Sequence, residues 1–537
     1  MDTDILACLD TTVPQLVRFG ELLRERSRTL PDNGQQLEHG LAWYATSIRA
    51  FQETANWLRT GVEDGWIGSG GLLTGRILLG ELLAECRSGV VMHQLETVRP
   101  GDFGVGAGDL QFFEEDCAAR LIREASSVGL RSQLVALISQ GAGGEGDFGL
   151  EGEPDARAMT EEIRRFSDAE IVPRAHGWHV ANAYIPEETI AGLAALGVFG
   201  ICVPEENGGA GASKTAMCAI TEELARAYIG AGSLGTRSEI AAELILAGGR
   251  GDQKALYLPR IASGEILPAA AFTEPEAGSD LGSVRCMAIR DGDSYLVNGA
   301  KIWITHAARA DLLTLLVRTD PAAPGYRGLS MLLIEKPRGT DADPFPVPGM
   351  SGSEIEVIGY RGMKEYEIGF QDFRVPASAL LGEVEGQGFR QLMQTFETAR
   401  IQTAARATGV ARSAADHALA YAMERRQFGK RLIDFPRVSN KIVKMHAEIL
   451  AARLLTLAAA RAKDAGHRCD LEAGMAKLYA ARVAWSAADG AVQIHGGNGF
   501  AVATPVSRIL CDARILSIFE GAAEIQAQII ARRLLES

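Results

Sequence analysis

Glu520 has the setting in this sequence that most suggests chemistry. It ends the apolar run 515–519 and precedes Gly521. Ile525, Ile529 and Leu535 share a helix face, which predicts a helix after the glycine and places Glu520 at a loop-to-helix entry. A helix N-terminus favours the ionised carboxylate, whereas burial beside Ile518 and Phe519 favours the neutral acid. A carboxylate balanced in this way suits a general base, and the alternative is a helix cap with no chemical role.

Five short sequence motifs occur in order between residues 158 and 537. They are Phe272-Thr273-Glu274-Pro275-Glu276-Ala277-Gly278-Ser279-Asp280, Trp303-Ile304-Thr305, Glu424-Arg425-Arg426-Gln427-Phe428-Gly429, Gln493-Ile494-His495-Gly496-Gly497-Asn498-Gly499 and Phe519-Glu520-Gly521. In these motifs the chain resembles the acyl-CoA dehydrogenase family. An ordered set is far more specific than any single motif, and it favours the base over the cap at Glu520.

The resemblance implies FAD-dependent α,β-dehydrogenation of an acyl-CoA thioester. Glu520 would remove the α-proton, and the β-hydrogen would pass as hydride to flavin N5. The thioester oxygen would accept hydrogen bonds from the backbone N–H of Glu520 and from the flavin ribityl chain. Some family members carry the base at a second position, which corresponds here to Ala399, so Glu520 is the one candidate at the two known positions.

The resemblance also implies a set of residues that contact FAD. They are Phe272, Thr273, Gly278, Ser279, Trp303, Ile304, Thr305, Arg425, Phe428, Gln493, Gly496, Gly497, Gly521, Ala522 and Glu524. Trp303 would lie near the flavin ring and Thr305 would donate toward N5, since a two-residue repeat puts them on one face of a strand. Arg425 would meet the pyrophosphate and the 493–497 loop the adenosine half, both across a subunit boundary.

The chain departs from the family pattern at two places near the expected flavin site. Ala522 stands where threonine is common, and Pro436 stands where glutamine is common. Each change removes a side chain that could hydrogen-bond to the flavin, while the remaining residues of the five motifs still predict the cofactor.

The expected substrate follows from a closer resemblance within the family. The segment 303–311, the stretch 349–369 and a long N-terminal extension resemble the branch that oxidises (2S)-methylsuccinyl-CoA to mesaconyl-CoA in the ethylmalonyl-CoA pathway, with electron-transfer flavoprotein as acceptor. A buried acyl pocket for such a substrate needs a cation or several donors for the free carboxylate.

Arg237 is the first candidate partner for that carboxylate. Thr236, His306 and Arg309 are alternatives, and a solvated surface position for Arg237 stays open. Further substrate contacts are expected at Ser279, Glu397, Arg400 and Gly521.

Two other readings compete with this function. A dehydrogenase or oxidase for another short-chain acyl-CoA would contain the same motifs. A DNA-associated adaptive-response flavoprotein would need a basic face, which fits poorly with a net charge of −14.

The elements that must position these residues are helical, then β, then helical. Helical spacing is seen, for example, at Leu41, Tyr44, Ile48, Phe51 and Ala55, and Asp291-Gly292-Asp293 and Asn298-Gly299 are hairpin-type turn signals. We expect an α+β fold with a helical N-terminal extension (1–140), a Gly-rich acidic linker (141–157), a helical domain (158–268), a middle β-barrel-like domain (269–384) and a C-terminal four-helix bundle (385–537). The extension is expected either to mediate interactions or to cover a surface that shorter relatives use to form tetramers. The second role predicts a homodimer, with a tetramer as the alternative.

Composition limits the possible partners and compartment. The chain has 537 residues, of which 47% are apolar, and its eight cysteines are scattered without metal-site spacing. No apolar run approaches the about 18 residues that span a bilayer, and the first four residues are acidic rather than basic. We therefore expect a cytoplasmic enzyme with no metal, nucleic-acid or membrane partner.

Overall fold

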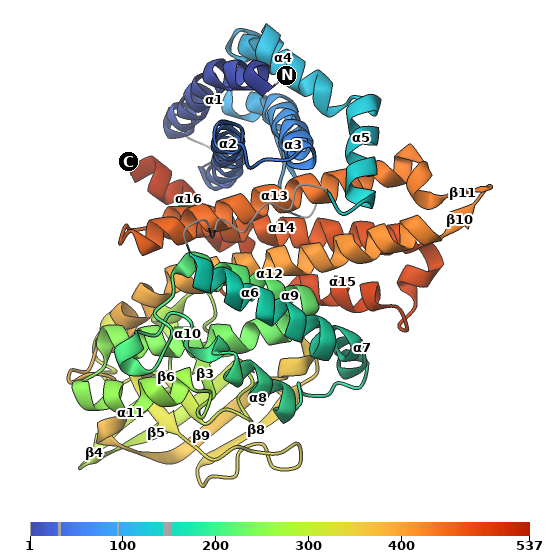
Figure 1. The fold of residues 1–537 in the computed structure, drawn as a ribbon. Coiled ribbons are helices and arrows are strands. Elements are labelled where there is room, and N and C mark those ends of the chain that lie inside the picture. The colour runs from blue at the N-terminus through green and yellow to red at the C-terminus, as the bar shows by residue number, and fades with distance from the viewer. Residues whose placement is uncertain (1, 30–33, 94–95, 143–149, 151–152, 537) are drawn as a thin grey trace. The chain divides into compact units, whose positions relative to one another are not determined.

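The computed structural model describes residues 2–29, 34–93, 96–142, 150 and 153–536. It forms two compact units, one made of Met1–Gly152 with Thr403–Ser537 and the other of Glu153–Gln402, and each is described by itself (Figure 1). Most of the expected linker 141–157 lies outside the described residues, and the helix that follows begins at Pro154.

The first unit is built from helices of the two ends of the chain. Its helices are α1 (Asp2–Thr29), α2 (Gly34–Glu63), α3 (Ser69–Ser88), α4 (Asp116–Ala125), α5 (Val128–Ser139), the part of α12 (Gly388–Glu424) from Thr403 onward, α13 (Pro436–Asp464), α14 (Asp470–His495), α15 (Pro505–Ile515) and α16 (Ala523–Glu536). Two short hairpins complete it, β1 (Val90–Val91) with β2 (Thr97–Val98) and β10 (Arg426–Gln427) with β11 (Lys430–Arg431).

The N-terminal helices pack directly on the C-terminal ones. Helix α2 contacts α13 and α16, while α3 and α5 contact α13. The apolar face expected on α2 is buried at Leu41, Tyr44, Ile48, Phe51 and Ala55. The extension therefore shares a hydrophobic core with the C-terminal helices, because its own helices bury their apolar faces against them.

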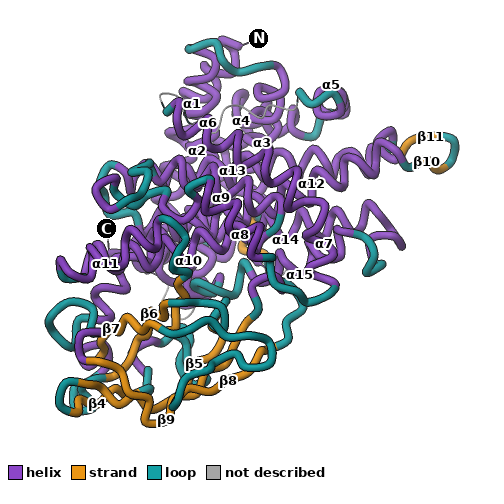
Figure 2. Tube along the Cα trace, turned by 60° about the horizontal axis from the view of Figure 1, so that its bottom comes forward, coloured by secondary structure: helices purple, strands orange, loops and turns teal. Residues whose placement is uncertain are grey.

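The second unit combines helices with one curled sheet. The helices are α6 (Pro154–Phe166), α7 (Val172–Val180), α8 (Glu187–Ala195), α9 (Lys214–Ala227), α10 (Ile229–Gly248), α11 (Gly251–Ala262) and the start of α12. The strands are β3 (Pro268–Ala271), β4 (Met287–Asp291), β5 (Ser294–Thr305), β6 (Leu312–Arg318), β7 (Leu329–Glu335), β8 (Met350–Ile355) and β9 (Glu365–Pro376). Figure 2 shows these strands gathered together.

The seven strands follow the order β3-β6-β4-β5-β9-β8, and β7 pairs with β6. Strand β3 runs parallel to β6, whereas β5 runs antiparallel to β9. The continuous apolar runs of β6 and β7 are explained by cover on both faces. Leu313 and Leu332 belong to the core enclosed by the curled sheet, and Leu316 and Leu333 belong to a second core with α10 and α11.

The structure confirms the expected fold class, in which helical N- and C-terminal parts are separated in the sequence by the strands of a curled β sheet. Of the two hairpin signals, Gly292-Asp293 joins β4 to β5 as predicted. The Asn298-Gly299 prediction is wrong, because Gly299 lies inside β5 at a register shift against β9, with φ +143°. Glycine there produces a bulge rather than a turn. Within the described part of the chain, no helix is long and apolar enough to cross a membrane.

Candidate active site

Glu520 lies in the loop between α15 and α16, at the predicted entry to a helix. The loop is held at both ends, since Phe519 N–H donates to the Ile515 carbonyl (3.1 Å) and Ala523 N–H donates to the Ser517 carbonyl (3.0 Å). Buried Lys477 of α14 also donates to the Gly521 carbonyl. Glu520 itself adopts a left-handed backbone with φ +53°, a conformation that is strained for a residue other than glycine.

The Glu520 carboxylate meets a buried arginine. Arg406 of α12 donates from Nη2 to Glu520 Oε2 at 2.6 Å, and the Arg406 side chain is 0% exposed. Thr403, one turn earlier, donates its hydroxyl to the same carboxylate oxygen. The Arg406 guanidinium lies over the Phe519 ring at 4.9 Å from its centroid. Glu520 is therefore held as a paired anion, because a hydrogen-bonded cation favours the charged form.

This environment corrects one part of the sequence interpretation. We expected burial beside Ile518 and Phe519 to favour the neutral acid, but Ile518 is 50% exposed and the dominant neighbour is Arg406. The sequence contains a signal for this buried cation. Arg406 is a charged residue in the otherwise apolar and small-residue stretch 404–411 of a helix, which predicts a buried cation in need of an acidic partner.

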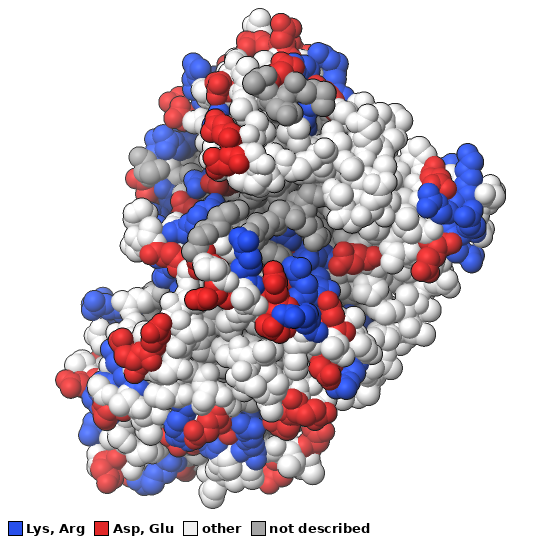
Figure 3. All heavy atoms as spheres, viewed as in Figure 1, with Lys and Arg blue, Asp and Glu red and all other residues white. Residues whose placement is uncertain are grey.

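The expected adenosine and pyrophosphate residues in the first unit lie on an exposed surface. Arg425 lies between the end of α12 and the β10–β11 hairpin. In this hairpin Phe428 is 93% exposed and has φ +51°. The basic tip of this hairpin is visible at the right of Figure 3. Asn498 donates to the Tyr421 hydroxyl (2.9 Å), and His495 stacks on the Tyr421 ring at 4.1 Å. These contacts place the fourth motif beside Tyr421, three residues before the third motif.

Other expected residues of that unit are also accessible. Gln493, Gly496, Gly497 and Glu524 are exposed, while Gly521 and Ala522 are half-buried. A Cβ atom at Gly496 or Gly497 would meet nothing within 4 Å, so a ligand can approach the backbone there.

A buried ion pair in the second unit joins the first motif to β5, two residues before the second motif. Lys301 of β5, 0% exposed, lies 2.8 Å from Glu274 Oε1 and donates to the Phe272 carbonyl at 3.1 Å. Glu274 also accepts from the backbone N–H groups of Arg285 (2.7 Å) and Cys286 (2.9 Å). Burial lowers the Lys301 pKa despite the pairing with Glu274. Neither residue of this pair was among the expected site residues.

Trp303 departs from the regular alternation that we expected along β5. The pairing with β9 shifts between Lys301 and Ile304, Trp303 has φ +60°, and its side chain is 53% exposed. Ile302 N–H, directly before the second motif, donates to the carbonyl of Thr273 in the first motif at 3.0 Å. Thr305 is buried and donates its hydroxyl to Glu365 Oε1 at 2.8 Å. This bulge, rather than a two-residue repeat, orients Trp303.

The residues of the second unit fit a flat aromatic cofactor. A half-exposed indole with a strained backbone is a large apolar surface that a planar ring can cover. Phe272 and Thr273 are half-buried beside it, and Gly278 and Ser279 are exposed. A Cβ at Gly278 would find its nearest neighbour, Thr273, only at 4.0 Å, so the backbone is open to a ligand.

The candidate partners for a substrate carboxylate differ in availability. Thr236 is buried and donates to the Gly232 carbonyl of its own helix at 3.1 Å. His306 is buried, and burial, with Arg338 as the next cause, lowers its pKa to about 3, so it is a neutral ring. Arg309 pairs with Glu187, donates to the Ile185 carbonyl and lies over the Tyr184 ring at 4.6 Å.

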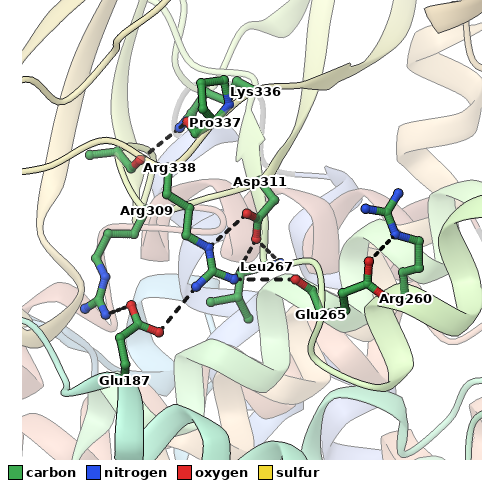
Figure 4. Close-up of polar contacts among 10 residues, drawn as sticks. Glu187, Arg260, Glu265, Leu267, Arg309, Asp311, Lys336, Pro337 and Arg338 are labelled. Carbon is green, nitrogen blue, oxygen red and sulfur yellow. Dashed lines mark hydrogen bonds and ion pairs between the residues drawn. The ribbon is translucent and has the colours of Figure 1, made fainter.

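Figure 4 shows that Arg309 belongs to an ion-pair network, in which Arg338 contacts Asp311 (2.8 Å) and Glu187 (3.3 Å). Arg237 of α10 is half-buried and near enough to His306 to help lower the pKa of that ring. Arg237 thus places a positive charge near the neutral His306 ring.

The two expected contacts on the early part of α12 are close together. Glu397 is half-buried, and Arg400, which is 7% exposed, lies over the Phe396 ring at 5.7 Å. Between them, Thr398 donates to Glu243 Oε1 at 2.8 Å, and Glu243 pairs with Lys214 at 2.7 Å. Burial raises the pKa of Glu243, and Lys214 opposes that effect.

Comparison with known proteins identifies the class. Family models described as the N-terminal, middle and C-terminal domains of acyl-CoA dehydrogenase match residues 153–265, 269–373 and 386–535. The chain belongs to the acyl-CoA dehydrogenase family, whose members are FAD-dependent oxidoreductases. Among relatives, the (2S)-methylsuccinyl-CoA dehydrogenase of Cereibacter sphaeroides is 57% identical over 499 residues, which cover 93% of this chain and 90% of that protein.

Two solved structures support the same class. A chain from work on the electron transferring flavoprotein of Acidaminococcus fermentans matches with a TM-score of 0.68 and 32% identity, covering 72% of this chain and 98% of that one. A glutaryl-CoA dehydrogenase from Mycobacterium smegmatis in complex with FADH2 matches with a TM-score of 0.65 and 26% identity, covering 72% and 95%.

Proposed function

We propose that this enzyme oxidises (2S)-methylsuccinyl-CoA to mesaconyl-CoA in the ethylmalonyl-CoA pathway. The observation that carries the proposal is the 57% identity to a (2S)-methylsuccinyl-CoA dehydrogenase, which extends over 93% of the chain and so reaches beyond the three domains of the family. Other relatives act on different acyl groups, for example an acryloyl-CoA reductase that is 35% identical over 73% of this chain. The acyl group of the substrate therefore differs between members of the family, and a carboxylate-bearing acyl group is the one proposed here.

Glu520 is the proposed base for the α-proton. Its carboxylate is held in one position by Thr403 and Arg406, and the left-handed loop that presents it is fixed by hydrogen bonds at both ends. A fixed acceptor lowers the entropic cost of reaching the α-carbon. The backbone N–H of Glu520 is the proposed donor to the thioester oxygen, where it would stabilise the charge that develops as the proton leaves.

FAD is the proposed cofactor, and when bound it would accept the two electrons and the β-hydrogen. Phe272, Thr273, Ser279, Trp303 and Thr305 would hold its flavin half. Arg425, Phe428 and the 493–497 loop would hold the pyrophosphate and adenosine of an FAD bound to a second copy of the chain. The exposure of Phe428 and of the open glycines at 496 and 497 supports this part of the proposal.

Arg237 is the proposed contact for the carboxylate in the second unit, because it is a half-buried cation near the neutral His306 ring. The proposed electron acceptor is electron-transfer flavoprotein, supported by the likeness to a chain studied with such a protein. We further propose a homodimer, because the N-terminal helices cover faces of α13 and α16 that would otherwise be available to another dimer. Analytical ultracentrifugation should then give a dimer mass.

Anaerobic titration of the purified flavoprotein with acyl-CoA thioesters tests the proposed function. Methylsuccinyl-CoA should bleach the flavin absorbance, and butyryl-CoA should bleach it far more slowly. Glu520→Gln should retain flavin but lose about 10⁴-fold or more in the rate of bleaching, since the amide cannot accept the proton. Bleaching by butyryl-CoA but not by methylsuccinyl-CoA would refute the substrate while leaving the family membership intact.

A further inference from the structure

Two consecutive carbonyls of the Glu520 loop are held by buried side chains from two different helices. Lys477 of α14 donates its ammonium to the Gly521 carbonyl, and Gln526 of α16 donates from Nε2 to the Glu520 carbonyl at 3.5 Å. Both side chains are 0% exposed. The hydrogen bonds at the two ends of the loop involve other backbone groups. The loop is therefore held at its centre as well as at its ends.

The backbone at the centre of the loop needs such support. Glu520 has φ +53° and Gly521 has φ +98°, so two successive residues lie in the left-handed region. A residue with a side chain keeps that conformation only where its surroundings impose it. The backbone angles of Glu520 set the direction of both its Cα–Cβ bond and its N–H group. A relaxed backbone would therefore turn the proposed base and the proposed thioester donor away together.

The packing around Gln526 matches its amide to this turn. A Cβ at Gly521 would overlap Gln526 Nε2, so the amide rests directly against the glycine. At the other end of the amide, a Cβ at Gly474 of α14 would lie 3.6 Å from Gln526 Oε1. That oxygen is buried and has no hydrogen-bond partner among the residues that the structure describes. An apolar side chain would avoid this unfavourable burial, so the stability of the fold alone does not explain a glutamine here.

Lys477 reaches the same turn from the neighbouring helix. It lies three residues after Gly474 on α14, so both residues share the face of α14 that contacts α16. A buried ammonium makes a strong, charge-assisted hydrogen bond to a carbonyl, because little water competes with it. Helix α2 of the N-terminal extension contacts both α14 and α16. The two helices that carry Lys477 and Gln526 thus have a third helix packed against them, which limits their movement.

We propose that Lys477 and Gln526 are positioning residues, which fix the backbone of Glu520 for removal of the α-proton. They act through Glu520, because their two hydrogen bonds maintain the left-handed turn that directs its carboxylate and its N–H group. The inference rests on the proposed role of Glu520 as the base and assigns the residues that keep this base in place.

The test measures flavin bleaching in single turnovers of the holoenzyme with methylsuccinyl-CoA and excess FAD. Lys477→Met keeps the length of the side chain but removes the donor. It should lower the limiting rate by about 30- to 100-fold, because a small misplacement of a base is enough for such a loss. Gln526→Met should lower that rate by about tenfold or more for the same reason. The substrate concentration at half-saturation should stay within about threefold of the wild-type value, since neither residue is a proposed substrate contact.

Lys444→Met is the matched control for the lysine variant. It is the same substitution on α13 of the same unit, at a side chain that is 47% exposed and lies 3.8 Å from Glu85 and 3.9 Å from Glu448. Exposed pairs of this length contribute little, so the control should change the rate of bleaching by less than about twofold.

A double-mutant cycle shows whether Lys477 acts through Glu520. In the Glu520→Gln background, adding Lys477→Met should change the residual rate of bleaching by less than about threefold, because the group that Lys477 positions is already lost. A residue with a merely structural role would lower the rate about equally in both backgrounds.

The proposal is overturned if either methionine variant bleaches within about threefold of the wild-type rate. It is also overturned if Lys477→Met slows the Glu520→Gln variant as strongly as it slows the wild type. If Lys477→Met does not fold, Gln526→Met is judged by the same two comparisons. Failure of the proposed base is a separate result, since Glu520→Gln would then keep its own rate of bleaching.

Discussion

Replacing Lys301 with methionine tests how the first motif is held against strand β5 in the second unit. The Lys301 side chain is fully buried, and its ammonium contacts Glu274 at 2.8 Å and the Phe272 carbonyl at 3.1 Å. Methionine has a similar length but leaves the Glu274 carboxylate buried without its cation. Removing one partner of a buried ion pair costs about 3–5 kcal/mol.

The lower end of that range is expected here. Glu274 keeps its hydrogen bonds from the backbone N–H groups of Arg285 and Cys286, so we expect a loss of about 3 kcal/mol, or roughly 6–12 °C in the unfolding temperature of a unit of this size. Differential scanning calorimetry measures the shift, and the ratio of flavin to protein absorbance measures retention of the cofactor. Flavin content should fall together with stability, because the pair fixes the loop that carries Phe272 and Thr273.

Two variants sharpen the result. Lys301→Met combined with Glu274→Gln removes both charges and should recover at least half of the lost stability, since no buried charge is left alone. Arg374→Met, in an exposed pair with Asp291 on the same sheet, should cost less than about 1 kcal/mol. The reasoning is refuted if Lys301→Met unfolds within about 1 kcal/mol of the wild type and keeps its flavin.

Three further predictions follow from individual residues. Gly521→Ala should lower turnover by about tenfold or more in a steady-state assay, because a Cβ would overlap the Gln526 side-chain amide and Gly521 has φ +98°; an unchanged rate would mean that the loop can move. Arg425→Gln should weaken FAD binding by about 10- to 100-fold in a fluorescence titration, since it removes the proposed charged hydrogen bond to the pyrophosphate. His306 stays neutral when folded, with a pKa of about 3, but protonates below pH 6.5 when unfolded, so stability should fall by about 1.4 kcal/mol per pH unit as the pH drops from 6.5 toward 3. His306→Asn, which suits the left-handed backbone at φ +63°, should remove that slope in urea titrations.

The sequence predicted those features that depend on local patterns. The helical extension, the curled sheet and the helical C-terminal part follow from periodicity, and the entry of Glu520 into a helix follows from an apolar run that ends at Gly521. The Gly292-Asp293 turn is equally local. Each of these features is set by neighbours in the chain, so a single sequence contains the information.

The contacts of the candidate site depend on residues far apart in the chain. Arg406 and Glu520 are 114 residues apart, and Lys301 and Glu274 are 27 apart. Neither pair has a local signal beyond a charge in an apolar stretch, and the partner of a buried charge cannot be chosen from sequence spacing alone. The bulge at Trp303 was missed for a related reason, because the shift in register is set by pairing with β9 rather than by the residues of β5.

The left-handed backbones at Trp303, Phe428 and Glu520 have a consequence for the evolution of this protein. Glycine adopts that conformation freely, whereas each of these larger residues lowers the free energy of unfolding by about 1–2 kcal/mol relative to glycine. In a library screened for thermal tolerance alone, glycine or asparagine should be enriched at Phe428, whose side chain is 93% exposed, but not at Glu520, whose loss would leave buried Arg406 without its anion. We expect variants recovered at Phe428 to be more stable but to bind FAD less tightly, because Phe428 is a proposed contact of the cofactor.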